Sequence, residues 1–278
     1  MTPAAAASPI SAQVDELWAR RAELTDADAT ARATVVAAID QLDAGAARVA
    51  IVADSGEVVV DQRAKRAILL AFKLLPMADV TVGPYHYRDR VPLKQPAAGV
   101  RAVPGAIARW GSYLAPGVVQ MPSYVNIGAY VDRDTLIDTW ATVGSCAQIG
   151  QRVHLSGGVG IGGVLEPEQA APVVVEDDAF VGSRCIVVEG ARVRRGAKLG
   201  AGLILTSSTR VYDAESGAEL PRGEVPERAV AVGSTRVKSF AGGDFGMPCV
   251  LVLRVLPEGA AHDKTMLNDI LREHGIAT

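Results

Sequence analysis

The chain has 278 residues and a formal net charge of −3, with 28 lysines and arginines against 31 aspartates and glutamates. This balance gives no reason to expect nucleic acid or an anionic membrane as a partner, and no run of about 18 apolar residues predicts a membrane span. Hydrophobic residues make up 49% of the chain, which excludes disorder, whereas only 5% are aromatic, which favours a narrow β-structure with little room inside.

Residues 1–100 predict a mostly helical N-terminal domain with one short pair of strands. The opening segment has neither a basic region nor a long apolar run, so we expect no signal peptide and a cytoplasmic protein. Apolar residues at helical spacing, a possible cap at Ser11 and two strand-like runs around a glycine turn define the elements. We expect helices after Ser11, over 27–43 and over 62–75, and strands over 48–53 and 57–61.

From residue 101 onward the sequence repeats every six residues. This period is neither the 3.6 of an α-helix nor the two of an ordinary strand, and it is typical of a parallel β-helix in which three hexads make one triangular coil. We expect the large residue of each hexad to point into the prism and a small residue four positions later to lie near a corner. The repeated positions, aliphatic except for Tyr113, are Ile107, Tyr113, Val119, Val125, Val131, Ile137, Val143, Ile149, Leu155, Ile161, and then Val175, Val181, Val187, Val193, Leu199, Leu205 and Val211.

The predicted fold is therefore mainly β. We expect a left-handed parallel β-helix over 101–234, an N-terminal α/β cap domain and a small C-terminal extension over 235–278. In the extension, 248–256 read as a strand and 263–274 as a helix that covers the open end of the coils.

One interruption breaks the register of the repeat at residues 162–174. Pro167 and Pro172 in this segment predict a loop that is extruded from the coils. Loops held on a rigid scaffold often carry function, so this loop is a candidate part of a site.

The positions of cysteine and histidine argue against a metal site. Cys146, Cys185 and Cys249 lie far apart and form no Cys-x-x-Cys pair, so we expect three reduced thiols. Of the four histidines only His154 lies in the repeats, whereas the γ-type carbonic anhydrases, which share the β-helix, need three zinc histidines. We therefore expect no bound metal.

Three long motifs in the repeats resemble one family of acyltransferases. They are MPSYVNIGAYVD at 121–132, DTWATVGSCAQIG at 138–150 and VHLSGGVGIGGVLEP at 153–167, and they resemble tetrahydrodipicolinate N-succinyltransferases. The resemblance implies transfer of a succinyl group from succinyl-CoA to the amine of ring-opened tetrahydrodipicolinate, in lysine and diaminopimelate biosynthesis. It also implies a homotrimer with active sites between neighbouring prisms, succinyl-CoA as a co-substrate, and no permanently bound cofactor.

The same scaffold serves other acceptors, so other functions stay open. These are an acetyl-CoA-dependent acyltransferase on the same or a related substrate, a sugar-nucleotide acyltransferase, and a non-catalytic β-helix scaffold. The scaffold interpretation leaves the three long motifs without an explanation.

Acyl transfer from a thioester to an amine needs a deprotonated amine, a stabilised thioester oxygen and alignment of the two. A dicarboxylate acceptor also favours arginine as a binding residue. By the resemblance, Arg101 in its Arg-x-Val-Pro motif binds the substrate, and Asp138 contacts the substrate amine. Asp138 directly follows the inward Ile137, so its side chain should face outward.

One departure from the family pattern leaves the catalytic base open. Where the family has Ser-Glu-Val-Val-Glu-Gly, residues 185–190 read Cys-Ile-Val-Val-Glu-Gly, and Ile186 cannot accept a proton. Asp138 and Glu189 are therefore the expected catalytic carboxylates, with Glu166 of the extruded loop as an alternative. His154 is a rival, because other hexapeptide acyltransferases use a histidine base.

We expect the later coils to hold the CoA arm. Small side chains at Gly200, Ala201 and Ser207 would let the pantetheine approach closely, and Lys238 or Arg210 would meet the phosphates. Backbone amides of 156–163 are candidates for stabilising the thioester oxygen. The basic run of Arg192, Arg194, Arg195 and Lys198 is interpreted instead as a solvated face.

Overall fold

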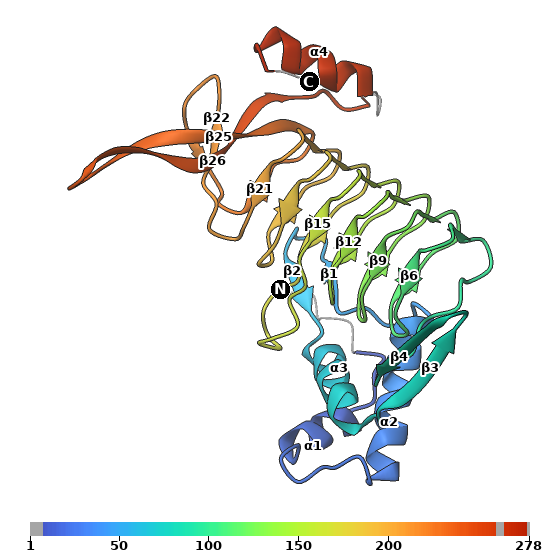
Figure 1. Ribbon diagram of the computed structural model, residues 1–278. Coiled ribbons are helices and arrows are strands. Elements are labelled where there is room, and N and C mark those ends of the chain that lie inside the picture. Colours follow the sequence, from blue (N-terminus) through green and yellow to red (C-terminus); the bar gives the residue numbers. More distant parts are fainter. Residues whose placement is uncertain (1–7, 260–263, 277–278) are drawn as a thin grey trace.

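The computed structural model describes residues 8–259 and 264–276. Figure 1 shows three parts: a cluster of N-terminal helices, a prism of stacked β-coils, and a C-terminal hairpin with one helix beside it. Residues 1–7, which begin the segment expected not to be a signal peptide, and residue 263, where the last helix was expected to begin, lie outside the described residues.

The N-terminal part contains the three expected helices and the expected strand pair. Asp28 and Asp61 begin the second and third helices, because each carboxylate accepts backbone N–H groups of the first turn. Ser11 is not the cap of the first helix: Ala12 holds that position, and its side chain makes no capping bond. The elements are α1 (Gln13–Ala19), α2 (Ala29–Asp43), β1 (Ala50–Val52), β2 (Val58–Val60) and α3 (Gln62–Leu74).

A second hairpin follows these helices and was not expected from the sequence. It consists of β3 (Ala78–Val82) and β4 (Tyr85–Asp89), which pair in antiparallel fashion. All of its strand residues are exposed, so there is no buried face to impose an alternation of apolar and polar residues.

The prism confirms the predicted parallel β-helix. Its strands are two residues long and pair in parallel with the strand one coil away, so that three sheets form its sides. The first side carries β5 (Arg101–Ala102), β8 (Val119–Gln120), β11 (Leu136–Ile137), β14 (His154–Leu155), β17 (Phe180–Val181) and β20 (Lys198–Leu199). The second carries β6 (Ile107–Ala108), β9 (Tyr124–Val125), β12 (Thr142–Val143), β15 (Gly160–Ile161), β18 (Ile186–Val187) and β21 (Ile204–Leu205). The third carries β7 (Tyr113–Leu114), β10 (Tyr130–Val131), β13 (Gln148–Ile149), β16 (Val174–Val175), β19 (Arg192–Val193) and β24 (Glu224–Val225).

Aliphatic side chains fill the interior of the prism. From Val125 to Leu205 every residue at the repeated position is at most 2% exposed. The small residues that precede the strands, such as Ala141 and Ala197, are buried equally well. Burial of apolar surface contributes about 25 cal/mol per Å², so this continuous core is the main stabilising feature of the coils.

The predicted phase of the repeat is wrong in the first coil. Ala108 pairs with Val125 and Gln120 with Ile137, a spacing of 17 residues where later coils have 18. The turn between Gln120 and Val125 is one residue shorter, and each two-residue strand has one inward and one outward member. The apolar pairs Ile107–Ala108 and Tyr113–Leu114 fit both phases, whereas the inward Gln120 is polar and donates a side-chain N–H to Ile107 O. The residues that point inward are Ala108, Leu114 and Gln120, in place of Ile107, Tyr113 and Val119.

The repeat also ends earlier than the sequence pattern predicts. Val193 pairs with Val225 rather than with Val211, so the chain leaves the coils after β21 and returns to them at β24. Between β21 and β24, β22 (Val211–Asp213) and β23 (Glu219–Leu220) pair as a hairpin, and Val211 lies opposite Val250 of a later strand.

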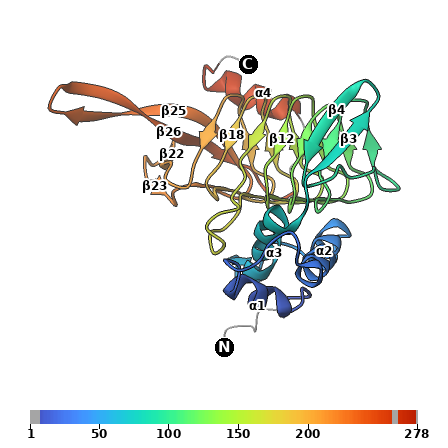
Figure 2. The same cartoon turned by 60° about the horizontal axis from the view of Figure 1, so that its bottom comes forward.

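A long hairpin forms most of the C-terminal part. It consists of β25 (Ala229–Phe240) and β26 (Gly243–Val255); β25 begins beside β20 on the first side, and its far half projects as an arm in Figures 1 and 2. The strand predicted over 248–256 is thus the second half of β26, and β25 runs across residue 234 without a break. The last helix, α4 (Lys264–Glu273), packs Leu267 and Leu271 against the base of the hairpin.

The segment between β15 and β16 leaves the coils at the expected place and is held by the N-terminal part. Lys65 of α3 is fully buried, and its ammonium donates hydrogen bonds to the backbone oxygens of Pro167 at 3.1 Å and Ala170 at 2.8 Å. Burial lowers the pKa of Lys65, because the charged form loses hydration. This lysine therefore fixes the loop against the helices.

The basic run after β16 is not the solvated face that the sequence suggested. Arg192 and Arg194 both contact Glu176, at 2.5 and 3.0 Å, and both approach Glu224. Lys198 is only 4% exposed, and only Arg195 is exposed. The run forms an ion-pair network because the stacked strands bring acidic residues of neighbouring coils beside it.

Candidate functional site

One corner of the prism differs from the other two. It joins the first side to the second and is called here the small-residue corner. It consists of residues 121–123, 138–140, 156–158, 182–184 and 200–202, one triplet from each successive coil. Most of these residues are Gly, Ser, Ala, Thr or Pro, and only Asp138 and Arg184 are charged. The corner between the third and first sides carries charges in every coil after the first, for example at 132–134 and 176–178, as a solvated turn does.

Asp138 faces outward at this corner, as its position after Ile137 predicted. Its Oδ1 accepts hydrogen bonds from the backbone N–H of Thr139 at 2.7 Å and from the Thr139 hydroxyl at 3.3 Å. Its Oδ2 lies 4.0 Å from Nε2 of His154, and the side chain remains 36% exposed. One oxygen is therefore fixed by the turn, while the other faces the imidazole and solvent.

His154 lies one coil away on the outer face of the first side. Its strand, β14, pairs with both β11 and β17, so its ring lies between Leu136 and Phe180. The rings of His154 and Phe180 meet edge to face at 5.1 Å. The histidine is thus close enough to Asp138 to orient it or to relay a proton.

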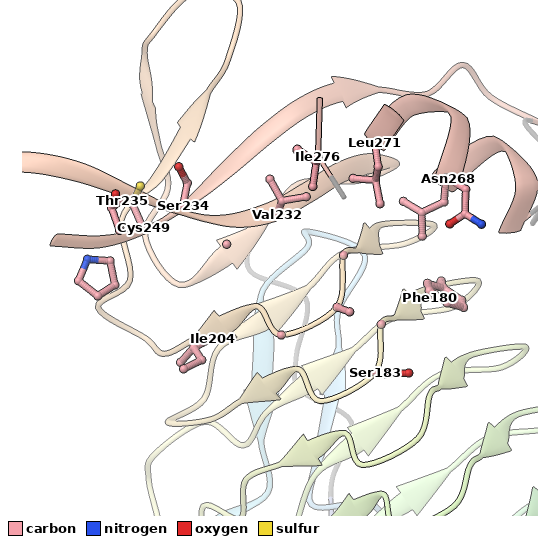
Figure 3. A pocket seen from close by; sticks show the side chains of 17 residues that line it. Phe180, Ser183, Ile204, Val232, Ser234, Thr235, Cys249, Asn268, Leu271 and Ile276 are labelled. Atoms are coloured by element: carbon pink, nitrogen blue, oxygen red, sulfur yellow. The ribbon is translucent and has the colours of Figure 1, made fainter. Parts of the chain in front are cut away.

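A groove of about 750 Å³ opens at the C-terminal end of the same corner. Figure 3 shows it between the last coils on one side and β25 with α4 on the other. Its floor is made of the small-residue corner, and its far wall is mostly apolar. The lining residues include Gly182, Ser183, Gly200, Ala201, Val232 and Leu271.

The floor of this groove leads to Asp138. Backbone N–H groups link successive coils at the same position: Asp138 N donates to Leu155 O, Ser156 N to Val181 O, and Gly182 N to Leu199 O. Ser156, Gly182 and Gly200 therefore continue the line of Asp138 at intervals of about 4.8 Å. A ligand in the groove can extend along this line until its end reaches the carboxylate.

Gly182 and Gly200 have a structural reason to be glycine. A Cβ at Gly182 would lie 2.5 Å from Leu199 O, and one at Gly200 would lie 3.0 Å from a methyl group of Val232. The corner is therefore tight for reasons of the fold, and the same lack of side chains keeps the floor of the groove open to a ligand.

The structure places the predicted CoA-binding residues at three separate locations. Gly200 and Ala201 line the groove. Ser207 lies at the corner between the second and third sides, where its hydroxyl donates to Glu189 at 3.4 Å. Lys238 lies on the projecting half of β25, with its ammonium 5.0 Å from the centre of the Phe240 ring.

The remaining predicted site residues also lie at separate places on the prism. Arg101 is exposed on β5, two strands from β11 on the first side, or about 10 Å along the prism from the level of Asp138. Glu189 is exposed at the other corner, together with Ser207. Within one chain, Asp138 and Glu189 therefore face different corners of the prism. Ile186, where the family has glutamate, lies outward on the second side and is 36% exposed.

Several groove residues were missed by the sequence analysis. The far wall comes from β25, β26 and α4, including Thr235, Cys249 and Leu267, and no local motif marks these positions. Burial raises the pKa of the Cys249 thiol. Arg184 at the small-residue corner was also missed, although counting hexads in threes would have placed it beside the groove.

The described residues contain no group of three or more His, Cys, Asp or Glu side chains that could hold a metal ion. None of the described helices is long and apolar enough to span a bilayer.

Comparison with known proteins gives consistent results for the N-terminal part and for the repeats. Residues 9–74 match a family model described as the N-terminal part of tetrahydrodipicolinate N-succinyltransferase, and residues 172–207 match one described as the hexapeptide repeat of succinyltransferases. The chain is 47% identical to a 2,3,4,5-tetrahydropyridine-2,6-dicarboxylate N-succinyltransferase of Chelativorans sp., over 87% of this chain and 89% of the relative. It is 46% identical to the protein of the same name from Acinetobacter baylyi, over 95% of this chain and 99% of the relative.

Proposed function

Because the chain belongs to the tetrahydrodipicolinate N-succinyltransferase family, we propose that it transfers the succinyl group of succinyl-CoA to the amine of ring-opened tetrahydrodipicolinate, 2-amino-6-oxopimelate. The observation that carries the proposal is the agreement with the named relatives over almost the whole chain. Lysine and diaminopimelate biosynthesis in the cytoplasm is the setting that this activity implies. Succinyl-CoA takes part as a co-substrate that is consumed in each turnover.

The groove supports this proposal as the binding site for the CoA arm. Its floor of Gly182, Gly200 and Ala201 lets a narrow chain approach the backbone, and Val232 and Leu271 offer apolar contacts to it. A pantetheine arm bound here would point its thioester along the corner toward Asp138. The groove thus aligns donor and acceptor, which is a large part of what acyl transfer requires.

Asp138 is the proposed group for the acceptor amine. A carboxylate that faces solvent on one oxygen can accept a hydrogen bond from the amine and help to remove its proton. The N–H of Gly157, one coil away, has no acceptor among the described residues and is a candidate donor to the thioester oxygen.

Glu189 and Arg101 enter this proposal through the assembly. Glu189 and Asp138 face different corners of one prism, so both can act on one substrate only when they come from neighbouring subunits. A homotrimer with sites in the grooves between prisms satisfies this condition. Arg101 is exposed on the same side as Asp138 and is the proposed partner of a substrate carboxylate.

The test is release of free thiol from acyl-CoA. Purified protein is incubated with tetrahydrodipicolinate and either succinyl-CoA or acetyl-CoA, and the product is identified by mass spectrometry. We expect thiol release with succinyl-CoA that depends on the acceptor. Faster turnover with acetyl-CoA would show that acetyl-CoA, rather than succinyl-CoA, is the donor. No thiol release with either acyl-CoA would overturn the proposal for this acceptor.

A further inference from the structure

Arg184 is the only cation at the small-residue corner. The five triplets of this corner contain two charged residues, Asp138 and Arg184, which belong to coils two apart. Ser183, directly before Arg184, lines the groove, and so does Gly202 of the next coil. The arginine therefore lies at the point where the groove ends and the line toward Asp138 begins.

The side chain of Arg184 is folded back across the coil that separates it from Asp138. A Cβ built on Gly158 would lie 2.6 Å from Cδ and 2.8 Å from Cζ of Arg184, so the guanidinium lies directly over this glycine. Gly158 in turn donates its N–H to Thr139 O at 2.8 Å, one coil further on. The guanidinium thus lies about one coil spacing, roughly 4.8 Å along the prism, from the coil of Asp138.

Arg184 also differs from the other arginines of the coils. Eleven arginines lie between residues 101 and 234. Nine of them make a side-chain hydrogen bond or ion pair with a described residue: Arg109, Arg133, Arg152, Arg192, Arg194, Arg195, Arg210, Arg222 and Arg228. Only Arg101 and Arg184 make none to the described residues, which leaves the five donors of each guanidinium for a ligand.

We propose that Arg184 binds the free carboxylate of the succinyl group and so selects succinyl-CoA over acetyl-CoA; this inference rests on the proposed function. Three carbon–carbon bonds separate the two carboxyl carbons of a succinyl group, a span of roughly 4 Å. That span matches the single coil between the guanidinium and Asp138. An acetyl group ends two carbons earlier and offers no anion, so it gains nothing from the arginine.

The position of Arg101 agrees with a separate arginine for each of the two substrates. The acceptor brings two carboxylates of its own, and Arg101 lies on the opposite side of Asp138 along the prism. The acceptor is therefore bound from the Arg101 end and the acyl donor from the groove end, with one arginine for each.

The experiment compares Arg184→Gln and Arg184→Lys with the wild-type protein as the full chain. We expect the KM for succinyl-CoA to rise about 10- to 100-fold in Arg184→Gln, as for loss of a charge-assisted pair, and less in Arg184→Lys. The inhibition constants of free CoA and acetyl-CoA, and the KM for tetrahydrodipicolinate, should change less than about twofold. A rise in the inhibition constant of free CoA equal to the rise in KM would overturn the inference, and so would a change confined to the KM of the acceptor.

Arg152→Gln is the matched control. Arg152 has the same left-handed backbone conformation as Arg184, with φ of 54° against 61°, but it lies at another corner. Its kinetic constants should equal those of the wild type, and melting curves confirm that each variant is folded. Wild-type protein that releases no thiol from succinyl-CoA overturns the proposed function and this inference together, whereas active wild type with unchanged Arg184→Gln kinetics overturns the inference alone.

Discussion

At the scale of single residues, Asp138 is the proposed group for the acceptor amine, and His154 is its nearest titratable neighbour. The turn at Thr139 fixes one oxygen of Asp138, and the other lies 4.0 Å from the imidazole. This geometry gives the carboxylate direct access to an amine, while the histidine lies behind it against Phe180. The two residues should therefore contribute unequally.

We expect Asp138→Asn to lower kcat about 10²- to 10⁴-fold, which is the range for loss of a general base. Asparagine keeps the oxygen that accepts from Thr139, so the fold of the corner should survive. His154→Gln should lower kcat by less than tenfold. Steady-state rates of thiol release for both variants check the order, and a larger effect at His154 would make the histidine the base.

Two buried thiols, Cys185 in the core of the prism and Cys146 in the core formed with the N-terminal helices, give a pH dependence of stability. Burial raises the pKa of Cys185 from 9.0 to about 11 and that of Cys146 to about 12. Above pH 9 the unfolded chain loses these protons while the folded protein keeps them. Their contribution to stability is therefore complete below pH 9 and is lost as the pH rises toward 11 and 12.

We expect the free energy of unfolding to fall by about 1.4 kcal/mol per pH unit for each thiol above pH 9. Urea denaturation between pH 8 and 10.5 measures this slope. The double variant Cys146→Ala, Cys185→Ala should be less stable at pH 8, because it loses buried contacts, but its stability should decline more slowly. If the free energies of unfolding of the two proteins declined in parallel with pH, the two buried thiols would not be the cause of the decline.

At the scale of elements, the six-residue period predicted the coils because every coil repeats the same steric conditions. A wide side chain fits inside only at one position, the buried position before each strand holds mostly small residues, and many corners contain a residue with φ above zero, such as Gly128 or Gly202. The phase of the first coil was not predictable in this way. Ile107 and Ala108 are both apolar, so either could point inward. For Val119 and Gln120 the observed phase places the polar residue inside, which a hydrophobic pattern does not predict. The short turn after Gln120 carries no signal of its own.

The corrected phase can be tested by paired substitutions. Leu114 is 3% exposed inside the prism, whereas Val119 lies on the outer face and is half-buried. We expect Leu114→Ala to lower the free energy of unfolding by about 2–4 kcal/mol, as for other buried leucines, and Val119→Ala by less than about 1 kcal/mol. Chemical denaturation of both variants decides between the two phases, since the uncorrected phase predicts the opposite order.

The site was predictable only as far as the coils themselves. Asp138, Gly200 and Ala201 follow inward residues of one side, so their shared corner is implied by the period. Glu189 follows Val187 of the second side by two residues, and counting sides would have separated it from Asp138. The far wall of the groove was beyond prediction, because it forms only when β25, β26 and α4 fold back on the last coils.

At the scale of the whole molecule, the proposed roles of Asp138 and Glu189 can be combined only if more than one copy of the chain forms the site. Asp138 and Glu189 belong to corners on either side of the second side of the prism, and stacked coils cannot bring these corners together. If both carboxylates act on one substrate, each site must combine Asp138 of one subunit with Glu189 of a neighbour. Sedimentation of the wild-type protein should then show a trimer.

Mixing two inactive variants tests this arrangement directly. Asp138→Ala and Glu189→Ala should each be nearly inactive, because every site in each homotrimer lacks one carboxylate. When the two are unfolded together in equal amounts and refolded, about three quarters of the trimers contain both variants. In each mixed trimer one site of the three receives Asp138 and Glu189 from subunits that retain them, so activity should recover to roughly a quarter of the wild-type value. Sites built within a single chain would recover no activity on mixing, because each chain would still lack one of the two carboxylates.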